Sequence, residues 1–209
     1  MSDTDHALGA DRETLAVYDA QAGEYAALFD HDGGPGALLS RFIGAVPKGA
    51  RVLDYGCGTG AAAAHMAAAG LRVDAFDGSA EMVALAQARD GVNAWQSTFD
   101  DFEAPDTYHG VWANFSLLHA PRGALPRLLH KIADSLLAQG ILHIGMKTGE
   151  GEGRDGLGRR YTYVRAAELR RMVEGEGFEI VAQDTGHEVG LAGSDDWWIV
   201  LMAQKVADA

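Results

Sequence analysis

The chain has 209 residues, of which 47% are hydrophobic and 22% are charged. This length and composition favour one globular domain and exclude an intrinsically disordered chain, which would carry too few apolar residues to form a core. The formal net charge of -13 repels phosphate backbones and anionic lipid surfaces, so we expect neither nucleic acid nor a membrane as a partner.

The cysteine content and the N-terminal segment bear on the compartment. Cys57 is the sole cysteine and cannot form an intramolecular disulfide, and no cysteine cluster is present to hold a structural zinc. Residues 1–12 are polar and acidic, unlike a signal peptide, and no apolar run reaches membrane-spanning length. We therefore expect a cytoplasmic protein without a bound metal.

Hydrophobic periodicity predicts the elements in chain order. Two helices, at 14–29 and 37–46, precede an apolar strand at 51–55, a glycine turn at 56–60 and an Ala-rich helix at 61–69. Strands at 71–76, 92–96, 110–115 and 140–146 then alternate with helices at 80–89 and 123–137. The glycine-rich stretch 147–160 predicts a long loop, followed by a helix at 165–175 and strands at 178–183 and 197–204. Such alternation predicts a parallel sheet covered on both faces.

The glycine turn reads Gly56-Cys57-Gly58-Thr59-Gly60 and directly follows a strand. Glycines let backbone amides approach a ligand, and the helix that follows presents unpaired N–H groups, so doubly wound sheets bind nucleosides at such turns. A dinucleotide-binding enzyme satisfies the same glycine pattern. Asp54, two residues before the first glycine, favours a positively charged ligand without phosphate, because its carboxylate would repel a pyrophosphate.

The run from Val52 to Gly60, VLDYGCGTG, closely resembles the signature of class I S-adenosylmethionine-dependent methyltransferases. The resemblance extends over nearly the full chain. It implies an α/β fold, with a Rossmann-like, doubly wound and mostly parallel seven-stranded sheet that has an antiparallel C-terminal strand. It also implies S-adenosylmethionine as cofactor and S-adenosylhomocysteine as product. We expect a single domain over 1–209, with a helical cap at 1–48 and the Rossmann-like core at 49–209.

The resemblance also implies which residues bind the cofactor. Asp77, at the end of the second strand, would accept hydrogen bonds from both ribose hydroxyls, for which a carboxylate has matching acceptor oxygens. Met82 and the pair Thr98-Phe99 would lie at the adenine, although Thr98 departs from the acidic residue that the family often has there. The full expected set is Tyr18, Asp54, Gly56, Gly58, Gly60, Asp77, Gly78, Met82, Thr98, Phe99 and Asn114.

The fourth strand resembles the small-molecule branch of the family, because it lacks the Asn-Pro-Pro-aromatic motif of enzymes that methylate DNA bases or protein glutamine. Methyl transfer from a sulfonium is an in-line displacement, which needs a general base only if the acceptor arrives protonated. His119 follows the fourth strand and is the candidate base or acceptor-orienting group, since strand carboxyl ends face the ligand. A packed or capping histidine is the alternative.

Four further residues are candidates for the substrate side: Tyr25, Arg159, Tyr161 and Tyr163. Arg159 would offer a guanidinium to an anionic acceptor, and the tyrosines would offer aromatic surface. In the alternative interpretation, the tyrosines pack and Arg159 pairs with a surface carboxylate such as Glu168.

The sequence leaves three functions open. The first is transfer of a methyl group to a small-molecule acceptor. The others are an NAD(P)-dependent oxidoreductase on a similar sheet and a non-catalytic protein that binds S-adenosylmethionine. We expect a monomer or a homodimer.

Overall fold

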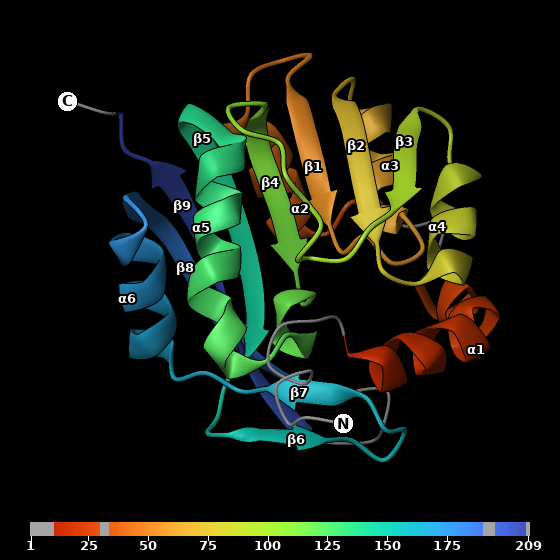
Figure 1. Cartoon of the computed structure of the whole chain (residues 1–209). Coiled ribbons are helices and arrows are strands. Elements are labelled where there is room, and N and C mark those ends of the chain that lie inside the picture. The colour runs from red at the N-terminus through yellow and green to blue at the C-terminus, as the bar shows by residue number, and fades with distance from the viewer. Residues whose placement is uncertain (1–10, 30–33, 190–194, 208–209) are drawn as a thin grey trace.

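The computed structural model describes residues 11–29, 34–189 and 195–207, so most of the predicted polar segment 1–12 lies outside the described residues. A seven-stranded sheet of order β3-β2-β1-β4-β5-β9-β8 forms the centre of the molecule (Figure 1). Its strands are β1 (Arg51–Tyr55), β2 (Arg72–Asp77), β3 (Val92–Gln96), β4 (Tyr108–Asn114), β5 (Leu136–Lys147), β8 (Phe178–Val189) and β9 (Asp195–Lys205). Strands β1 to β5 are parallel, and β9 runs antiparallel to β5 and to β8. The expected Rossmann-like α/β sheet with an antiparallel last strand is confirmed.

Helices cover both faces of this sheet. Figure 1 shows α5 (Leu125–Ser135) and α6 (Ala166–Gly175) in front of the sheet, with α2 (Ala37–Ala45) and α3 (Ala61–Ala68) behind it and α4 (Ala80–Gln87) beside β3. Side chains of β1 alternate between the two hydrophobic clusters. Leu53 and Tyr55 pack in the cluster on the α5 side, and Val52 packs with Phe42 of α2 on the other, as expected for a strand buried on both faces.

Helix α1 (Arg12–Phe29) and the hairpin of β6 (Glu152–Arg154) and β7 (Arg160–Thr162) lie at the edge to which the arrowheads of β1 to β4 point (Figure 1). Hydrogen bonds to α4 and to the hairpin help to hold α1 there. The hydroxyl of Ser79, at the start of α4, donates to Asp19 at 2.5 Å, and the backbone N–H of Arg160 donates to the hydroxyl of Thr14 at 2.8 Å. The helix therefore joins the sheet to the hairpin over the carboxyl edge.

The predicted division into a cap at 1–48 and a core at 49–209 stays a prediction. The two N-terminal helices differ in their surroundings. Phe42 of α2 is fully buried and packs on Trp112 of β4, with 5.4 Å between ring centroids. α2 thus covers the sheet, whereas α1 covers its edge.

The prediction of an irregular loop over 147–160 is wrong at residues 152–154, which pair with residues 160–162 in the β6–β7 hairpin. Strands of three residues are too short to give a hydrophobic period. Gly151 and Gly158 have φ values of +75° and +93°, so glycine serves the turns beside the strands.

Several predicted boundaries also differ; for example, the strand expected at 140–146 begins at Leu136. The helix expected at 123–137 ends at Ser135, and the strand expected at 178–183 continues to Val189. The added part of β8 is polar because β8 is an edge strand that pairs only with β9 in the sheet order. Among the described helices, none has the length and apolarity that a membrane crossing needs.

Candidate active site

The glycine turn between β1 and α3 is bound to β2. The backbone N–H groups of Gly56 and Cys57 donate to the carbonyl oxygen of Phe76 at 3.0 and 2.9 Å. Gly56 has φ +76°, and a Cβ atom there would lie 2.5 Å from the Cβ of Ser116. Only glycine allows this conformation together with this approach to the segment after β4.

The other two glycines of the turn have different surroundings. A Cβ atom at Gly60 would lie 2.9 Å from the Cα of Ala86, whereas one at Gly58 would meet nothing within 4 Å. Gly60 therefore allows α3 to begin close against α4. The backbone at Gly58 borders open space, where a ligand can approach it.

Asp77 ends β2 and is fixed by the backbone on either side. Its Oδ2 accepts a hydrogen bond from the N–H of Gly58 and its Oδ1 one from the N–H of Ser79, each at 2.9 Å. Burial raises the pKa of Asp77, while these backbone donors act in the opposite direction. Because each carboxylate oxygen can accept a second hydrogen bond, Asp77 retains acceptors for two ligand hydroxyls.

Asp54, the penultimate residue of β1, is buried, with 3% of its surface exposed. Its Oδ2 has no hydrogen-bond partner among the described residues. Burial, and secondly the charge of Asp77, raises the pKa of Asp54 to about 8. A cation bound next to this carboxyl group would stabilise its ionised form.

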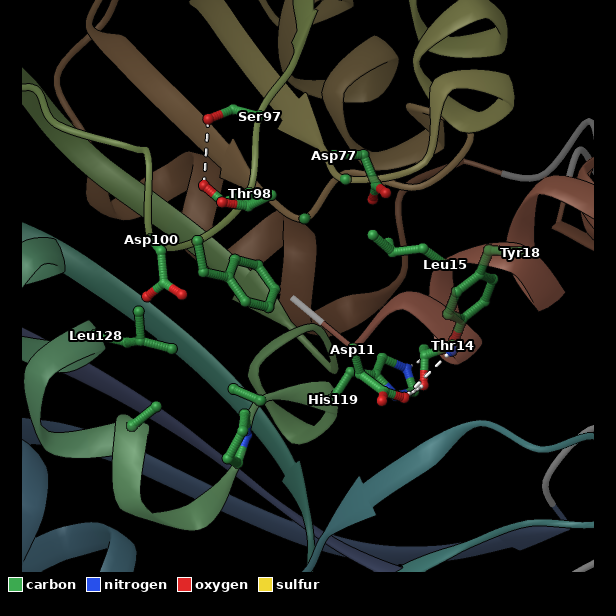
Figure 2. Close-up of a pocket in the computed structure, with 16 residues that line it drawn as sticks. Asp11, Thr14, Leu15, Tyr18, Asp77, Ser97, Thr98, Asp100, His119 and Leu128 are labelled. Carbon is green, nitrogen blue, oxygen red and sulfur yellow. Dashed lines mark hydrogen bonds between the residues drawn. The ribbon is translucent and has the colours of Figure 1, made fainter. Parts of the chain in front are cut away.

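Two adjoining cavities, of about 70 and 370 Å³, lie at the carboxyl edge of the sheet, and Tyr18, Gly56 and His119 line both. Figure 2 shows the smaller one, with Asp77 and Thr98 at the strand ends on one side and Leu15 and Tyr18 of α1 on the other. The smaller cavity brings together the predicted residues Asp77, Gly78, Thr98 and Phe99. The larger brings together Tyr25, Asp54, Gly58, Met82, Asn114 and Tyr161.

The segment after β3 forms one wall of the smaller cavity. Phe99 lines the cavity and also stacks on Tyr55, with ring centroids 5.1 Å apart, so it serves the core and the cavity together. The hydroxyl of Thr98 donates to Asp101 at 2.7 Å. Met82 lies apart from this pair, since it lines the larger cavity.

Asn114 ends β4 and is fixed from β5. Its Oδ1 lies 2.9 Å from Nε2 of His143. Burial lowers the pKa of His143 to about 3, so its ring is neutral at pH 7 and Nε2 can donate to the amide oxygen. This bond sets the orientation of the Asn114 amide in the larger cavity.

His119 lies in a short 3₁₀ helix, Leu117–His119, directly after β4. Its Nδ1 is 2.6 Å from the carbonyl oxygen of Arg160, and its Nε2 is 2.7 Å from the hydroxyl of Tyr18. A carbonyl oxygen can only accept, so Nδ1 carries the proton and Nε2 accepts from Tyr18. Burial lowers the pKa of His119 to about 4, which keeps the ring neutral at pH 7.

Arg159 does not line either cavity but lies behind the tyrosines that do. It is 2% exposed, and its Nε and Nη2 donate to Asp155 at 2.8 and 2.7 Å. Its Nη1 donates to the hydroxyl of Tyr25 at 2.9 Å, and its guanidinium lies 5.6 and 5.5 Å from the ring centroids of Tyr18 and Tyr161. The interpretation that pairs Arg159 with Glu168 is wrong, because Asp155 is the carboxylate that it binds.

Gly60 and Tyr163, like Arg159, are absent from both cavity linings. The lining residues that were not predicted include Lys147, Asp196 and Trp198. Lys147 ends β5, a position that by itself marks a residue facing the ligand. Asp196 and Trp198 begin β9, which is antiparallel, so its start reaches the edge at which the parallel strands end.

Comparison with known proteins supports a methyltransferase. Residues 52–140 match the model of a family described as a methyltransferase domain. No curated protein sequence matches the chain.

Many solved structures share the fold. A 1,6-didemethyltoxoflavin N1-methyltransferase from Burkholderia thailandensis has a TM-score of 0.74 and 20% identity, over 93% of this chain and 88% of that one. A S-adenosylmethionine-dependent methyltransferase from Methanosarcina mazei has a TM-score of 0.73 and 15% identity, over 84% and 100%. Phosphoethanolamine N-methyltransferase 2 from Haemonchus contortus has a TM-score of 0.69 and 18% identity, over 90% and 57%.

The polar groups that line the cleft match those of S-adenosylmethionine. Asp77 supplies the acceptors that a ribose diol needs, Asp54 supplies a buried carboxyl group for a cationic ligand, and the backbone at Gly58 is open to approach. S-adenosylmethionine is the cofactor, and the NAD(P)-dependent oxidoreductase is set aside. Together with the Val52–Gly60 signature and the sheet order, the family match over residues 52–140 supports a class I S-adenosylmethionine-dependent methyltransferase.

Proposed function

We propose that the protein transfers the methyl group of S-adenosylmethionine to a small molecule held in the larger cavity. The observation that supports this most directly is the size and lining of the cavity. Side chains of α1, β7 and β9 line it together with the strand ends, and it measures about 370 Å³. A cavity of this volume holds a small molecule beside Asn114. The net charge of -13 also disfavours nucleic acid.

We assign the cofactor to both cavities. Asp77 accepts the ribose hydroxyls, and Thr98 and Phe99 lie at the adenine in the smaller cavity. Asp54, Gly58 and Asn114 lie at the methionine end in the larger one. The cofactor supplies an already activated methyl group, so the protein contributes chiefly position and the exclusion of water.

Tyr18 and His119 are the proposed proton path. If the acceptor arrives as a hydroxyl or an ammonium, its proton passes to the hydroxyl oxygen of Tyr18 while the proton of Tyr18 passes to Nε2 of His119. The carbonyl oxygen of Arg160 holds Nδ1–H of His119 during this step, since it accepts that proton in a 2.6 Å hydrogen bond. This makes Tyr18 the group that touches the acceptor and His119 the group that accepts its proton.

Two of the similar structures have small molecules in their descriptions, 1,6-didemethyltoxoflavin and phosphomonomethylethanolamine. They support a small acceptor for this cavity without identifying it. A monomer or homodimer and a cytoplasmic location stay predictions of the sequence.

Fractionated substrates test the proposal. The protein is incubated with methyl-labelled S-adenosylmethionine and either a metabolite extract below about 1 kDa, total RNA, DNA or denatured protein. We expect label to enter the metabolite fraction alone, and a Tyr18→Phe variant to reduce that labelling. Label in a polymer fraction would overturn the small-molecule acceptor. Tight binding of S-adenosylhomocysteine with no labelling of any fraction would favour the non-catalytic alternative.

A further inference from the structure

The larger cavity extends beyond the residues assigned to the cofactor. At one end it is lined by the glycine turn and Asp54, and at the other by Tyr161 of β7, by Lys147 at the end of β5 and by Asp196 and Trp198 of β9. The family signature includes none of these four residues. Their end of the cavity is therefore available to a second ligand.

Lys147 and Asp196 form an ion pair at this end, with side chains only 15% and 9% exposed. The ammonium of Lys147 also lies 4.0 Å from the centroid of the Tyr161 ring. An ammonium has three N–H donors. The carboxylate takes one and the ring face a second, so one donor remains for an oxygen atom of a ligand.

The walls of the same region are aromatic. Tyr161 is nearly buried, and it stacks with Tyr163 at 6.2 Å between ring centroids. Trp198 lies edge to face with Phe115, with 6.3 Å between centroids, and both line the cavity. Aromatic rings pair with one another in stacked or edge-to-face geometry with a gain beyond buried area. Such walls favour a planar ring over a saturated one of equal size.

The charges argue against a phosphate-bearing acceptor. Two cations lie over the ring of Tyr161, and each is paired with a carboxylate, Lys147 with Asp196 and Arg159 with Asp155. An anionic group would have to be desolvated there without a cation of its own. An uncharged ring that accepts one hydrogen bond avoids this penalty.

We propose that Lys147, Asp196, Tyr161 and Trp198 recognise the acceptor, and that they select an uncharged aromatic or heteroaromatic ring carrying a hydroxyl or carbonyl oxygen. The inference rests on the proposed function, in which the larger cavity holds the acceptor. It adds Lys147 as the donor to the ring oxygen and Asp196 as the residue that excludes anions.

Four matched probes separate the contributions of ring, oxygen and charge. They are 4-methylphenol, toluene, 4-methylcyclohexanol and 4-methylphenyl phosphate, each titrated by ligand-observed NMR into protein saturated with S-adenosylhomocysteine. We expect 4-methylphenol to bind at least tenfold more tightly than each of the other three. Equal binding of 4-methylcyclohexanol, tighter binding of the phosphate, or no binding of 4-methylphenol to the saturated protein would overturn the proposal.

Variants distinguish recognition from a purely structural ion pair. Lys147→Met should weaken 4-methylphenol binding about tenfold, whereas Lys147→Arg should restore most of it. Lys48→Met, which removes an exposed lysine outside both cavities, is the matched control and should change nothing. Asp196→Asn leaves the charge of Lys147 without its carboxylate and should increase the affinity for 4-methylphenyl phosphate about tenfold.

The structural alternative predicts that Lys147→Met and Asp196→Asn lower Tm while the order of probe affinities stays the same, and that result would refute the assignment. The affinity for S-adenosylhomocysteine is measured in every variant. If the wild-type protein does not bind S-adenosylhomocysteine, the cofactor assignment is contradicted. If it binds S-adenosylhomocysteine but binds the four probes in the opposite order of affinity, only the acceptor class is contradicted.

Discussion

The hydroxyl of Tyr18 in α1 lies 2.7 Å from Nε2 of His119, which is 101 residues further along the chain. The contact exists because α1 crosses the carboxyl edge of the sheet just where the chain leaves β4. It joins the helix that covers the cavity to the strand end that carries the candidate base. The carbonyl oxygen of Arg160 fixes the imidazole proton on Nδ1 of His119. In the contact with Tyr18, the hydroxyl therefore donates and Nε2 accepts.

Tyr18→Phe and His119→Gln should each lower kcat about a hundredfold, the usual scale for losing general acid–base assistance. Affinity for S-adenosylhomocysteine should change less than threefold by calorimetry. Because burial lowers the pKa of His119 to about 4, kcat of the wild-type protein should decline only near that pH and not near 6.5. Tyr108→Phe, which removes a buried hydroxyl bonded to Asp74 at 3.2 Å, is the control. Equal losses of kcat and cofactor affinity in both variants would mark the pair as structural.

Asp77→Asn should weaken binding of S-adenosylhomocysteine tenfold to a hundredfold, the range for hydrogen bonds to a charged group. The amide retains only one acceptor oxygen, yet the backbone N–H groups of Gly58 and Ser79 both point at this side chain. Titration calorimetry measures the affinity, and thermal melting without cofactor shows whether the variant is folded. Unchanged affinity in a folded variant would remove Asp77 from the ribose site.

The sequence predicted best what depends on local chemistry. Gly56 to Gly60 and Asp77 could be placed because strand, turn and strand end are adjacent in the chain, and the alternation of strands with helices predicted a parallel sheet. Lys147 was within reach of the same argument, since it ends β5.

Residues whose position in the site depends on an antiparallel strand or on burial could not be placed in this way. Asp196 and Trp198 reach the cavity only because β9 is antiparallel, so its first residues, and not its last, lie at the carboxyl edge. Arg159 was assigned to an anionic acceptor or to a surface carboxylate such as Glu168, whereas its carboxylate partner, Asp155, belongs to the same glycine-rich stretch. No periodicity in that stretch indicates that both side chains are buried.

Asp54 should couple cofactor binding to proton release. In the cofactor-free protein its pKa is about 8, against an ordinary value of 3.8. At pH 7 the carboxyl group is then largely protonated, and a bound ammonium or sulfonium favours its ionised form. Binding should release a fraction of a proton, measurable as the dependence of the calorimetric enthalpy on the ionisation enthalpy of the buffer. The neighbouring buried groups Asp77 and Cys57 also have raised pKa values, so the measurement compares wild type with Asp54→Asn.

The raised pKa of Asp54 also makes the stability of the cofactor-free protein depend on pH. Between about pH 4 and pH 8 the native state holds a proton on Asp54 that the unfolded state has lost, so the free energy of unfolding decreases as pH rises through this window. Asp54→Asn should remove this decrease and raise Tm at pH 8 without cofactor. A variant with the same pH dependence and the same proton release as the wild type would show that Asp54 is ionised throughout.

Gly56→Ala should destabilise the fold by about 3 kcal/mol, because the new Cβ adds strain at φ +76° and overlaps the Cβ of Ser116. Cofactor affinity should fall as well, since the turn must shift from β2. Gly153→Ala is the matched control, as its Cβ would meet nothing within 4 Å. Denaturant unfolding of both variants gives the comparison, and equal stabilities would mean that the segment at Ser116 can move aside.

Arg159→Met should destabilise the protein by about 3–5 kcal/mol, because it leaves the carboxylate of Asp155 in a buried position without its cation. The exposed ion pair of Arg165 with Glu150 provides the control, since both side chains are at least 70% exposed and Arg165→Met should change stability by no more than about 0.5 kcal/mol. A double variant, Arg159→Met with Asp155→Leu, should recover much of the loss because it removes the stranded charge together with its partner. If the double variant is no more stable than Arg159→Met alone, the contacts of the guanidinium with Tyr18, Tyr25 and Tyr161 must carry the stability in place of the ion pair.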